Sequence, residues 1–306
     1  MKKVGIVLLS VLMSFMAVNA VERVVYGENS RLERIDEPIS YFKNKPSATI
    51  SGRDFMLKAD TADFWTLEDM IVDAVLEGNM PQVLKQFQKI VFTTSVVDTV
   101  EILREPHTVE LLVLPDYVAI GNDEDFVRMP MGPLAGQRIA DSLDCILPTT
   151  FMVDRIAEAS EGNIDIFPFR PLDNRNCMPI VFQDSNNAIN AVMKAKGYKF
   201  GQFISGLKKD IVLTYKILTL SGMEKNVAIY GWHHPDGRTQ QPLHVKHGNF
   251  YADYSHGIRL ISRTVVVDGK KCDAREILES PALYRLLSDE PMPLKKATYA
   301  GNPKWK

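Results

Sequence analysis

Apolar residues at helical spacing first appear beyond position 63. Thr66 is a suitable N-cap, and the apolar positions that follow it predict a helix that ends at Gly78. These positions are Leu67, Met70, Ile71, Ala74 and Val75. Pro81 then occupies the first position of a second predicted helix, with apolar residues at Leu84, Phe87, Ile90 and Val91. The pattern therefore predicts a helical hairpin.

The rest of the chain mixes strand-like and helix-like patterns. Apolar and β-branched runs predict strands at residues 96–103, 108–114, 117–120, 178–182, 211–220, 227–230 and 258–267. Helical spacing predicts helices at residues 133–143, from Thr149 or Thr150 onward, at 185–196 and at 275–287. Asp268-Gly269 is a hairpin signal that closes the last strand.

This order of elements predicts an α+β fold with a mixed or mainly antiparallel sheet and packed helices. Residues 21–63 are charged and irregular, so they are predicted to form an N-terminal arm. Residues 64–306 are predicted to form a single domain. The proline-rich segment 162–175 is a possible seam between two lobes of this domain.

The first 20 residues have the pattern of a secretory signal peptide. Lys2 and Lys3 precede an apolar run from Val4 to Val18, and Ala20 stands at the expected cleavage point. No later apolar run approaches the ~20 residues needed to cross a bilayer, so no membrane span is predicted. We therefore expect a secreted or periplasmic protein.

The charge balance limits the possible partners, and the cysteine count bears on disulfide formation. The chain has 36 basic and 38 acidic residues, and loss of Lys2 and Lys3 with the signal peptide makes the mature chain more acidic. Such a balance argues against non-specific nucleic-acid binding. Two of the cysteines Cys145, Cys177 and Cys272 can pair in an oxidising compartment, but an odd count indicates no disulfide framework.

Side chains able to catalyse a reaction or bind a metal are concentrated between Tyr230 and Leu260. This stretch holds five of the six histidines of the chain: His233, His234, His244, His247 and His256. Carboxylates, a serine and aromatic residues stand among them. Because histidine can both bind metals and transfer protons near neutral pH, the stretch predicts a functional site.

Several short motifs resemble those of an uncharacterised family of secreted bacterial proteins. The motifs are GWH at 231–233, QPL at 241–243, His247, YADYSHGIRL at 251–260, LAGQRIAD at 134–141, LPTTFMVD at 147–154, SGLKKD at 205–210 and LLSDE at 286–290. The resemblance covers most of the mature chain but implies no activity. The chain departs from the pattern at Leu207, where we expect the family to carry a histidine.

A second, fragmentary resemblance is to L,D-transpeptidases, which carry an SHGC-type motif followed by an arginine. Ser255, His256, Gly257 and Arg259 fit this motif. The nucleophilic cysteine would fall at Ile258, and without a thiolate that chemistry cannot proceed.

Two catalytic hypotheses fit the stretch. In the first, His233, His247 and either Asp253 or His256 hold a zinc-like ion that activates water, although the spacing matches no standard zinc motif. In the second, which needs no cofactor, a histidine oriented by Asp253 or Asp210 activates Ser255.

Other residues complete the list of predicted site residues. His256, Ser255, Lys209 and Asp210 are the predicted catalytic residues. A buried lysine at position 208 or 209 could act as a base, although adjacent lysines are usually exposed. Arg259 is predicted to bind an anionic group of the substrate.

A binding module and a purely structural network are the alternatives to catalysis. Trp232, Tyr251 and Tyr254 are predicted to stack on sugar rings or peptide side chains of a ligand. Histidines at strand ends also commonly form hydrogen-bond networks that fix loops. We expect a hydrolase that acts on a cell-envelope polymer such as peptidoglycan, or on a small molecule, with non-catalytic glycan or peptide binding as the alternative.

Overall fold

A computed structural model of the chain describes residues 30–94, 106–166, 168 and 175–300. It has the α+β architecture that the sequence predicts, with mainly antiparallel sheets and packed helices. The predicted signal peptide at 1–20 and the predicted strand at 96–103 lie outside the described residues, as does part of the predicted seam.

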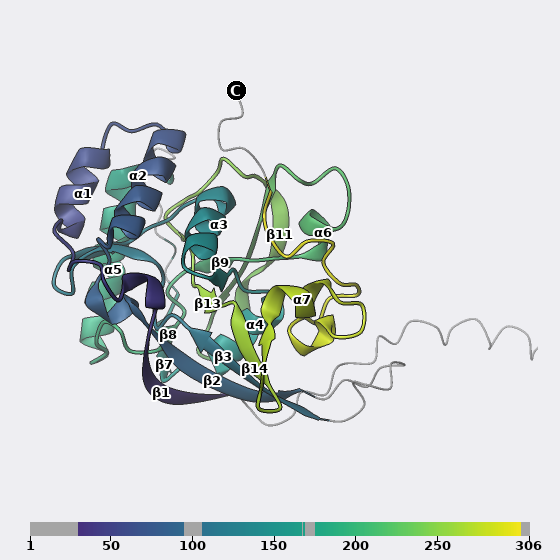
Figure 1. Cartoon of the computed structure of the whole chain (residues 1–306). Helices are drawn as coiled ribbons and strands as arrows, with labels where there is room; N and C mark the ends of the chain where they lie inside the picture. The colour runs from purple at the N-terminus through teal and green to yellow at the C-terminus, as the bar shows by residue number, and fades with distance from the viewer. Residues whose placement is uncertain (1–29, 95–105, 167, 169–174, 301–306) are drawn as a thin grey trace, which may run out of the picture.

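The larger sheet has seven strands and forms the base of the molecule in Figure 1. Its main path runs in the order β1-β2-β3-β13-β6, and β14 pairs with both β3 and β15. The strands are β1 (Arg31–Pro38), β2 (Gln86–Thr94), β3 (His107–Val113), β6 (Cys145–Ile146), β13 (Ile261–Ser262), β14 (Thr264–Val267) and β15 (Lys270–Asp273). Asp268 and Gly269 turn the chain between β14 and β15 with positive φ angles of 50° and 77°, as the hairpin signal predicts.

The second sheet carries most of the histidine-rich stretch. Its four strands lie in the order β11-β10-β9-β12. They are β9 (Lys209–Ile211), β10 (Asn226–His233), β11 (Thr239–Gly248) and β12 (His256–Gly257). Two further pairs are β4 (Ala119–Gly121) with β5 (Phe126–Arg128), and β7 (Gly162–Asn163) with β8 (Ile204–Ser205).

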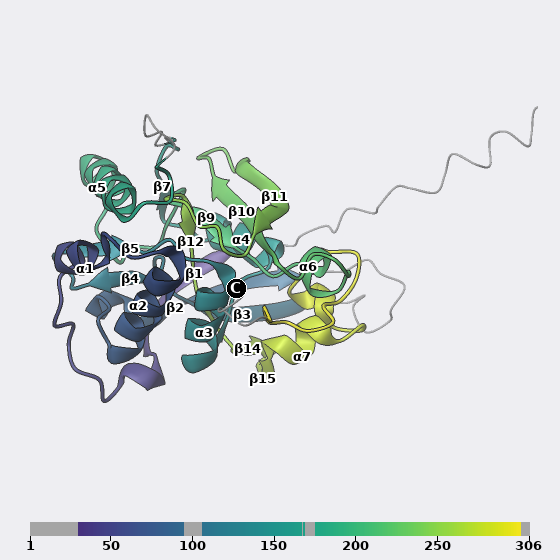
Figure 2. The same cartoon turned by 90° about the horizontal axis from the view of Figure 1, so that it is seen from above.

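Most of the helices lie at two ends of the molecule, and α3 and α4 lie between them (Figures 1 and 2). Figures 1 and 2 both show α1, α2 and α5 on one side and α6 and α7 on the other. The helices are α1 (Gly52–Ala59), α2 (Phe64–Glu77), α3 (Pro133–Ser142), α4 (Thr150–Glu158), α5 (Pro179–Ala195), α6 (Tyr215–Leu218) and α7 (Ala274–Glu279). Helix α4 packs against both β2 and β10, so it connects the two larger sheets.

One large apolar cluster extends through both sheets and the helices between them. Ile71 and Val75 of α2, Ile90 of β2 and Ile229 of β10 all belong to it, and each is almost fully buried. The periodic apolar faces of these elements are covered by one another, which is the main source of their stability.

The prediction of a second helix after Pro81 is wrong. Residues Gln82–Leu84 form a single 3-10 turn, and the chain then enters β2. Pairing with β1 on one edge and β3 on the other satisfies the backbone of β2, and these long-range partners outweigh the local helical spacing. The first helix, α2, ends at Gly78 with φ 96° as predicted, although Asp63 rather than Thr66 caps its start.

Several other segments differ from the sequence-based predictions, among them the helix predicted at 275–287, which ends at Glu279 as α7. Residues 178–182, predicted as a strand, lie at the start of α5, where Pro179 occupies the first turn. Only the start of the strand predicted at 211–220 belongs to a sheet, because Thr214 caps the short helix α6. In the predicted arm, β1 pairs with β2 and α1 buries Phe55, so this part of the chain adds regular elements to the fold.

Two smaller findings bear on partners and redox state. Across the part of the chain that the structure describes, every helix is too short or too polar to traverse a lipid bilayer. Cys145, Cys177 and Cys272 are all unpaired, and Cys145 is buried, where desolvation raises the pKa of its thiol.

Candidate active site

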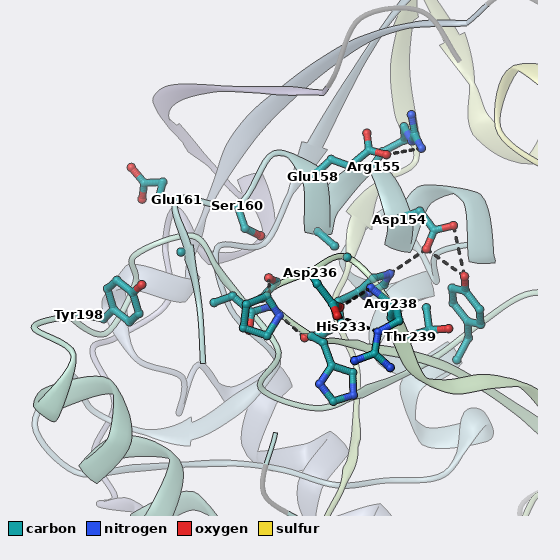
Figure 3. Close-up of a pocket in the computed structure, with 18 of the residues that line it drawn as sticks. Asp154, Arg155, Glu158, Ser160, Glu161, Tyr198, His233, Asp236, Arg238 and Thr239 are labelled. Atoms are coloured by element: carbon teal, nitrogen blue, oxygen red, sulfur yellow. Dashed lines mark hydrogen bonds and ion pairs between the residues drawn. The ribbon is translucent and has the colours of Figure 1, made fainter. Parts of the chain in front are cut away.

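A cleft of about 1270 Å³ opens beside the end of β10. One wall is formed by α4 and the turn that follows it, up to Asn163. Another is formed by residues from Tyr230 to Thr239, and Lys196 and Tyr198 border the cleft from the end of α5. The cleft therefore brings together segments that are far apart in the sequence (Figure 3).

Asp154 and His233 form a hydrogen-bonded pair in this cleft, which we call the cleft dyad. His233 Nε2 lies 2.8 Å from Asp154 Oδ1, as the dashed line in Figure 3 shows. The hydroxyl of Tyr230 donates to the same carboxylate, at 3.0 Å from Oδ1 and 3.2 Å from Oδ2. Because a carboxylate accepts hydrogen bonds, Nε2 carries the proton of neutral His233, and Nδ1 presents the lone pair.

A kink at the end of β10 brings His233 to the dyad. In a regular strand, residues three apart point to opposite faces, so Tyr230 and His233 could not both reach Asp154. Gly231 and Trp232 have positive φ angles of 94° and 56°, and the pairing register with β11 shifts just before them. This irregularity turns His233 to the side of Tyr230, in the manner of a β-bulge that redirects a side chain.

Asp154 owes its position to the start of α4. Thr149 caps the helix by accepting a hydrogen bond from the Met152 N–H at 3.2 Å. Met152 and Val153 are buried, whereas Asp154 is only partly buried and lies on the cleft side. Asp154 was not among the predicted site residues, and its only signal in the sequence is its place in the LPTTFMVD motif.

A fully buried polar layer lies beneath the dyad. Asp210 accepts a hydrogen bond of 2.9 Å from the Tyr117 hydroxyl, and burial raises the pKa of this carboxyl to about 6. A cavity of about 10 Å³ is lined by Asp210, His233 and Arg259 among others. Among the described residues, Asp210 Oδ1 and two guanidinium nitrogens of Arg259 have no hydrogen-bond partner. An ordered water is the usual occupant of such a polar site.

A second cluster, the histidine stack, consists of His244, His247, Tyr251 and His256. The rings of His244 and His247 lie 4.7 Å apart, His247 stacks on Tyr251 at 4.5 Å, and Tyr251 meets His256 edge-on at 5.7 Å. None of the four residues lines the cleft. Lys209 and Asp210 are neighbours on β9, so their side chains point to opposite faces of the sheet. His256 pairs with Lys209 in the parallel β9–β12 ladder and therefore faces away from the buried layer around Asp210.

Asp253 connects the histidine stack to Ser255. It accepts hydrogen bonds from the Ser255 N–H at 2.8 Å, the Ser255 hydroxyl at 2.5 Å and the Tyr251 hydroxyl at 3.1 Å. His256 Nε2 lies 3.9 Å from Asp253, beyond hydrogen-bonding distance. Burial lowers the pKa of His256 to about 4, so this imidazole is neutral at physiological pH.

The two adjacent lysines have different environments. Lys208 is buried, and its ammonium donates to the Tyr254 carbonyl at 2.5 Å. Burial lowers the pKa of Lys208 to about 7 and also lowers that of Lys209. The Lys209 ammonium lies 5.5 Å from the centre of the Trp232 ring, as in a cation–π contact. The expectation that both lysines are exposed is wrong for Lys208.

Three predicted substrate-binding residues are buried and occupied by other contacts. Trp232 donates its indole N–H to the Gly206 carbonyl at 2.8 Å, and Tyr254 packs into the apolar core. Arg259 is 1% exposed, donates to the Ile204 carbonyl and lies over the Tyr117 ring. These side chains therefore support the site from within. Only Tyr251 of the predicted stacking residues is partly exposed.

The predicted metal ligands do not form one group. His233 belongs to the cleft dyad, whereas His247 belongs to the histidine stack and Asp253 binds Ser255. Within the described residues, no set of three or more His, Cys, Asp or Glu side chains is arranged to hold a metal ion. Zinc binding stays a prediction from composition.

The charged rim of the cleft is largely neutralised by internal ion pairs. Arg155 binds Glu158 at 2.5 Å, and Arg238 binds Asp236 at 2.7 Å. Glu161 pairs with Arg34, which reaches the rim from β1. Because these cations and anions are paired with one another, the cleft suits a polar substrate that has no large net charge.

Comparisons with known protein families, with curated proteins and with solved structures found no match to this chain. The resemblance to an uncharacterised secreted family therefore stays a prediction.

Proposed function

We propose that the protein is a secreted hydrolase that cleaves a polymer of the cell envelope in this cleft, with His233 as its general base. The observation that carries the proposal is the cleft dyad. A histidine whose Nε2 is held by a carboxylate has an oriented ring and a basic Nδ1.

The chemistry follows from the arrangement of the two side chains. His233 Nδ1 accepts a proton from the attacking group and later returns it to the leaving group. Asp154 holds the ring in one orientation and stabilises the imidazolium that forms during the reaction. Tyr230 restrains Asp154 in turn, so the side chains that position the base are themselves hydrogen bonded.

A polymer is the substrate class that fits best. The cleft is long enough to include side chains from α4, from the β10–β11 turn and from the end of α5. Most of the residues that line it carry polar side chains, and Tyr198 adds an aromatic side chain at one end (Figure 3). The predicted signal peptide would deliver the mature chain to the cell envelope, where glycans and peptidoglycan are the abundant polar polymers.

Incubation of the mature protein with purified peptidoglycan sacculi tests this proposal. Wild-type protein should release soluble fragments, and His233→Ala should lower the rate by about 100-fold or more because general-base catalysis is lost. His234→Ala is the matched control. His234 also lines the cleft but bonds to Gln240, so this variant should keep wild-type activity.

The same experiment separates catalysis from binding. Co-sedimentation with sacculi without release of fragments would indicate a non-catalytic binding protein and would overturn the proposed hydrolase. Equal activity of wild type and a folded His233→Ala variant would also overturn the assignment of the base.

A further inference from the structure

We propose that Ser205 is the nucleophile of this site and that the bond cleaved is an amide or an ester. The inference rests on the proposed hydrolase function and specifies its reaction. It replaces Ser255, the serine that the sequence favoured.

Ser205 and His233 face the same space. Both line the large cleft, and both line the cavity of about 10 Å³ beneath it. Ser255 lines neither, and its hydroxyl is already donated to Asp253. Of the two serines, Ser205 is therefore the one beside the dyad.

Asn163 fixes Ser205 relative to His233. Its side-chain Nδ2 donates to the Ser205 hydroxyl oxygen at 2.8 Å and to the His233 carbonyl at 2.8 Å. Asn163 and Ser205 are also direct neighbours in the parallel β7–β8 pair. One amide group thus connects the hydroxyl to the backbone of the base, which makes Asn163 a positioning residue.

The backbone next to Ser205 leaves room for Asn163 to lie close to the serine. Ser205 ends β8, and Gly206 follows with φ 80°. A Cβ atom at position 206 would lie 2.6 Å from the Ile164 carbonyl and 2.9 Å from Asn163 Oδ1. Only glycine lets Asn163 come close enough to bind the serine.

The hydroxyl of Ser205 is suited to donate its proton. Among the described residues it accepts one hydrogen bond, from Asn163, and donates none. In the cleft dyad, His233 uses Nε2 to bind Asp154, and Nδ1 keeps its lone pair. Asp154, His233 and Ser205 therefore supply the acid, base and nucleophile of a catalytic triad.

The reaction is balanced without any further reagent except water. Ser205 Oγ forms a bond to the substrate carbonyl carbon while its proton passes to His233. The C–N or C–O bond then breaks, and His233 returns the proton to the leaving amine or alcohol. Water attacks the acyl-serine in the same way, which releases the acid and restores Ser205.

A fluorophosphonate probe tests the nucleophile independently of the natural substrate. Mass spectrometry of the labelled wild-type protein should locate one adduct on Ser205. Labelling should be absent from Ser205→Ala and at least about 100-fold slower in His233→Ala, because the base is missing. A wild-type protein that is not labelled at Ser205 would overturn the inference.

Ser160→Ala is the matched control for this experiment. Ser160 lines the same cleft, but its hydroxyl donates to the Ile156 carbonyl at 2.9 Å, so the variant should be labelled like wild type. Circular dichroism establishes whether each variant is folded. The position of the adduct in the wild-type protein shows whether Ser205 is the nucleophile, even if a variant does not fold.

Sacculi digestion distinguishes this inference from the proposed function. If wild type and Ser205→Ala release fragments equally, hydrolysis stands but Ser205 is not the nucleophile. If Ser205 is labelled but no fragments are released, the nucleophile stands and the assigned polymer is wrong.

Discussion

His256 illustrates how burial controls the chemistry of a single side chain. It is fully buried, and neither ring nitrogen has a hydrogen-bond partner among the described residues. Burial lowers its pKa from 6.5 to about 4, so the charged form is disfavoured in the folded protein. His256 is therefore a neutral residue within the histidine stack, although the sequence marks it as a catalytic candidate.

We predict that His256 makes the fold sensitive to acid. Between pH 6.5 and pH 4 the unfolded chain binds a proton at this residue and the folded chain does not, so stability falls as pH falls. The contribution can reach about 1.4 kcal/mol per pH unit. Urea unfolding of wild type and His256→Gln from pH 7 to pH 4 measures it, and parallel curves for the two proteins would contradict it.

Asp154 gives a second prediction about a single residue. Asp154→Asn keeps the size of the side chain but removes the carboxylate that holds the Nε2 proton of His233. We expect turnover of sacculi to fall by about 100-fold or more, with little change in melting temperature because the side chain is partly exposed. Unchanged turnover would exclude Asp154 as the residue that orients His233.

The end of β10 shows how one element builds the site. Gly231 allows the kink, and a Cβ atom there would lie 2.9 Å from Val153 Cγ1 on α4. Strand and helix therefore approach closely at the point where His233 meets Asp154.

We predict that Gly231→Ala is more damaging than Gly237→Ala. Both glycines have positive φ, 94° and 83°, but a Cβ atom at Gly237 meets nothing within 4 Å. The conformational cost is about 1 kcal/mol in each case, and crowding against Val153 adds about 1–3 kcal/mol only at Gly231. Urea unfolding of both variants measures the difference, and equal stabilities would contradict the close packing.

Helices α2 and α3 are joined by a buried carboxyl. Glu68 of α2 accepts a hydrogen bond from the N–H of Gly132, the N-cap of α3, at 2.9 Å. Burial raises the pKa of Glu68 to about 8, against the opposing effect of hydrogen bonds from Gly132 and Ala135.

We predict that Glu68→Gln removes a loss of stability that wild type shows between pH 4.5 and pH 8. Between pH 4.5 and pH 8 the folded protein keeps the Glu68 proton that the unfolded chain releases, so stability falls as pH rises. The amide still accepts a hydrogen bond but does not titrate. Unfolding curves at pH 5 and pH 8 should show that the variant gains stability relative to wild type at the higher pH.

The whole molecule is held together by contacts between distant segments. The Tyr299 hydroxyl accepts from the Ala228 N–H of β10 at 3.1 Å and donates to the Val212 carbonyl at 2.7 Å. Tyr299 is 6% exposed and packs in the same apolar cluster as both sheets. The C-terminal segment therefore contributes to the core.

We predict that Tyr299→Phe destabilises the whole fold. It leaves a buried N–H and a buried carbonyl unpaired, which costs about 1–3 kcal/mol for each group. Unfolding monitored by fluorescence and by circular dichroism should shift together, because the core is shared. Tyr41→Phe, which loses a single partly buried hydrogen bond to the Leu76 carbonyl, should have a smaller effect.

Local periodicity predicted several elements because their stabilising contacts lie close in the sequence. Helix α2 has its apolar stripe and its terminal Gly78, and α4 has its Thr149 cap. The segment that forms β2 has apolar residues that fit either a helix or a strand. Its strand partners β1 and β3 decide between them, and helical spacing carries no information about those partners.

The site was predictable only in part. The clustering of histidines identified His233, but Asp154 lies 79 residues earlier in the chain and has no local pattern in common with it. The same clustering grouped His233 with His247, whereas strand alternation and the kink at Gly231 direct them to different environments. Composition reveals which chemical groups are present, and tertiary packing decides which of them meet.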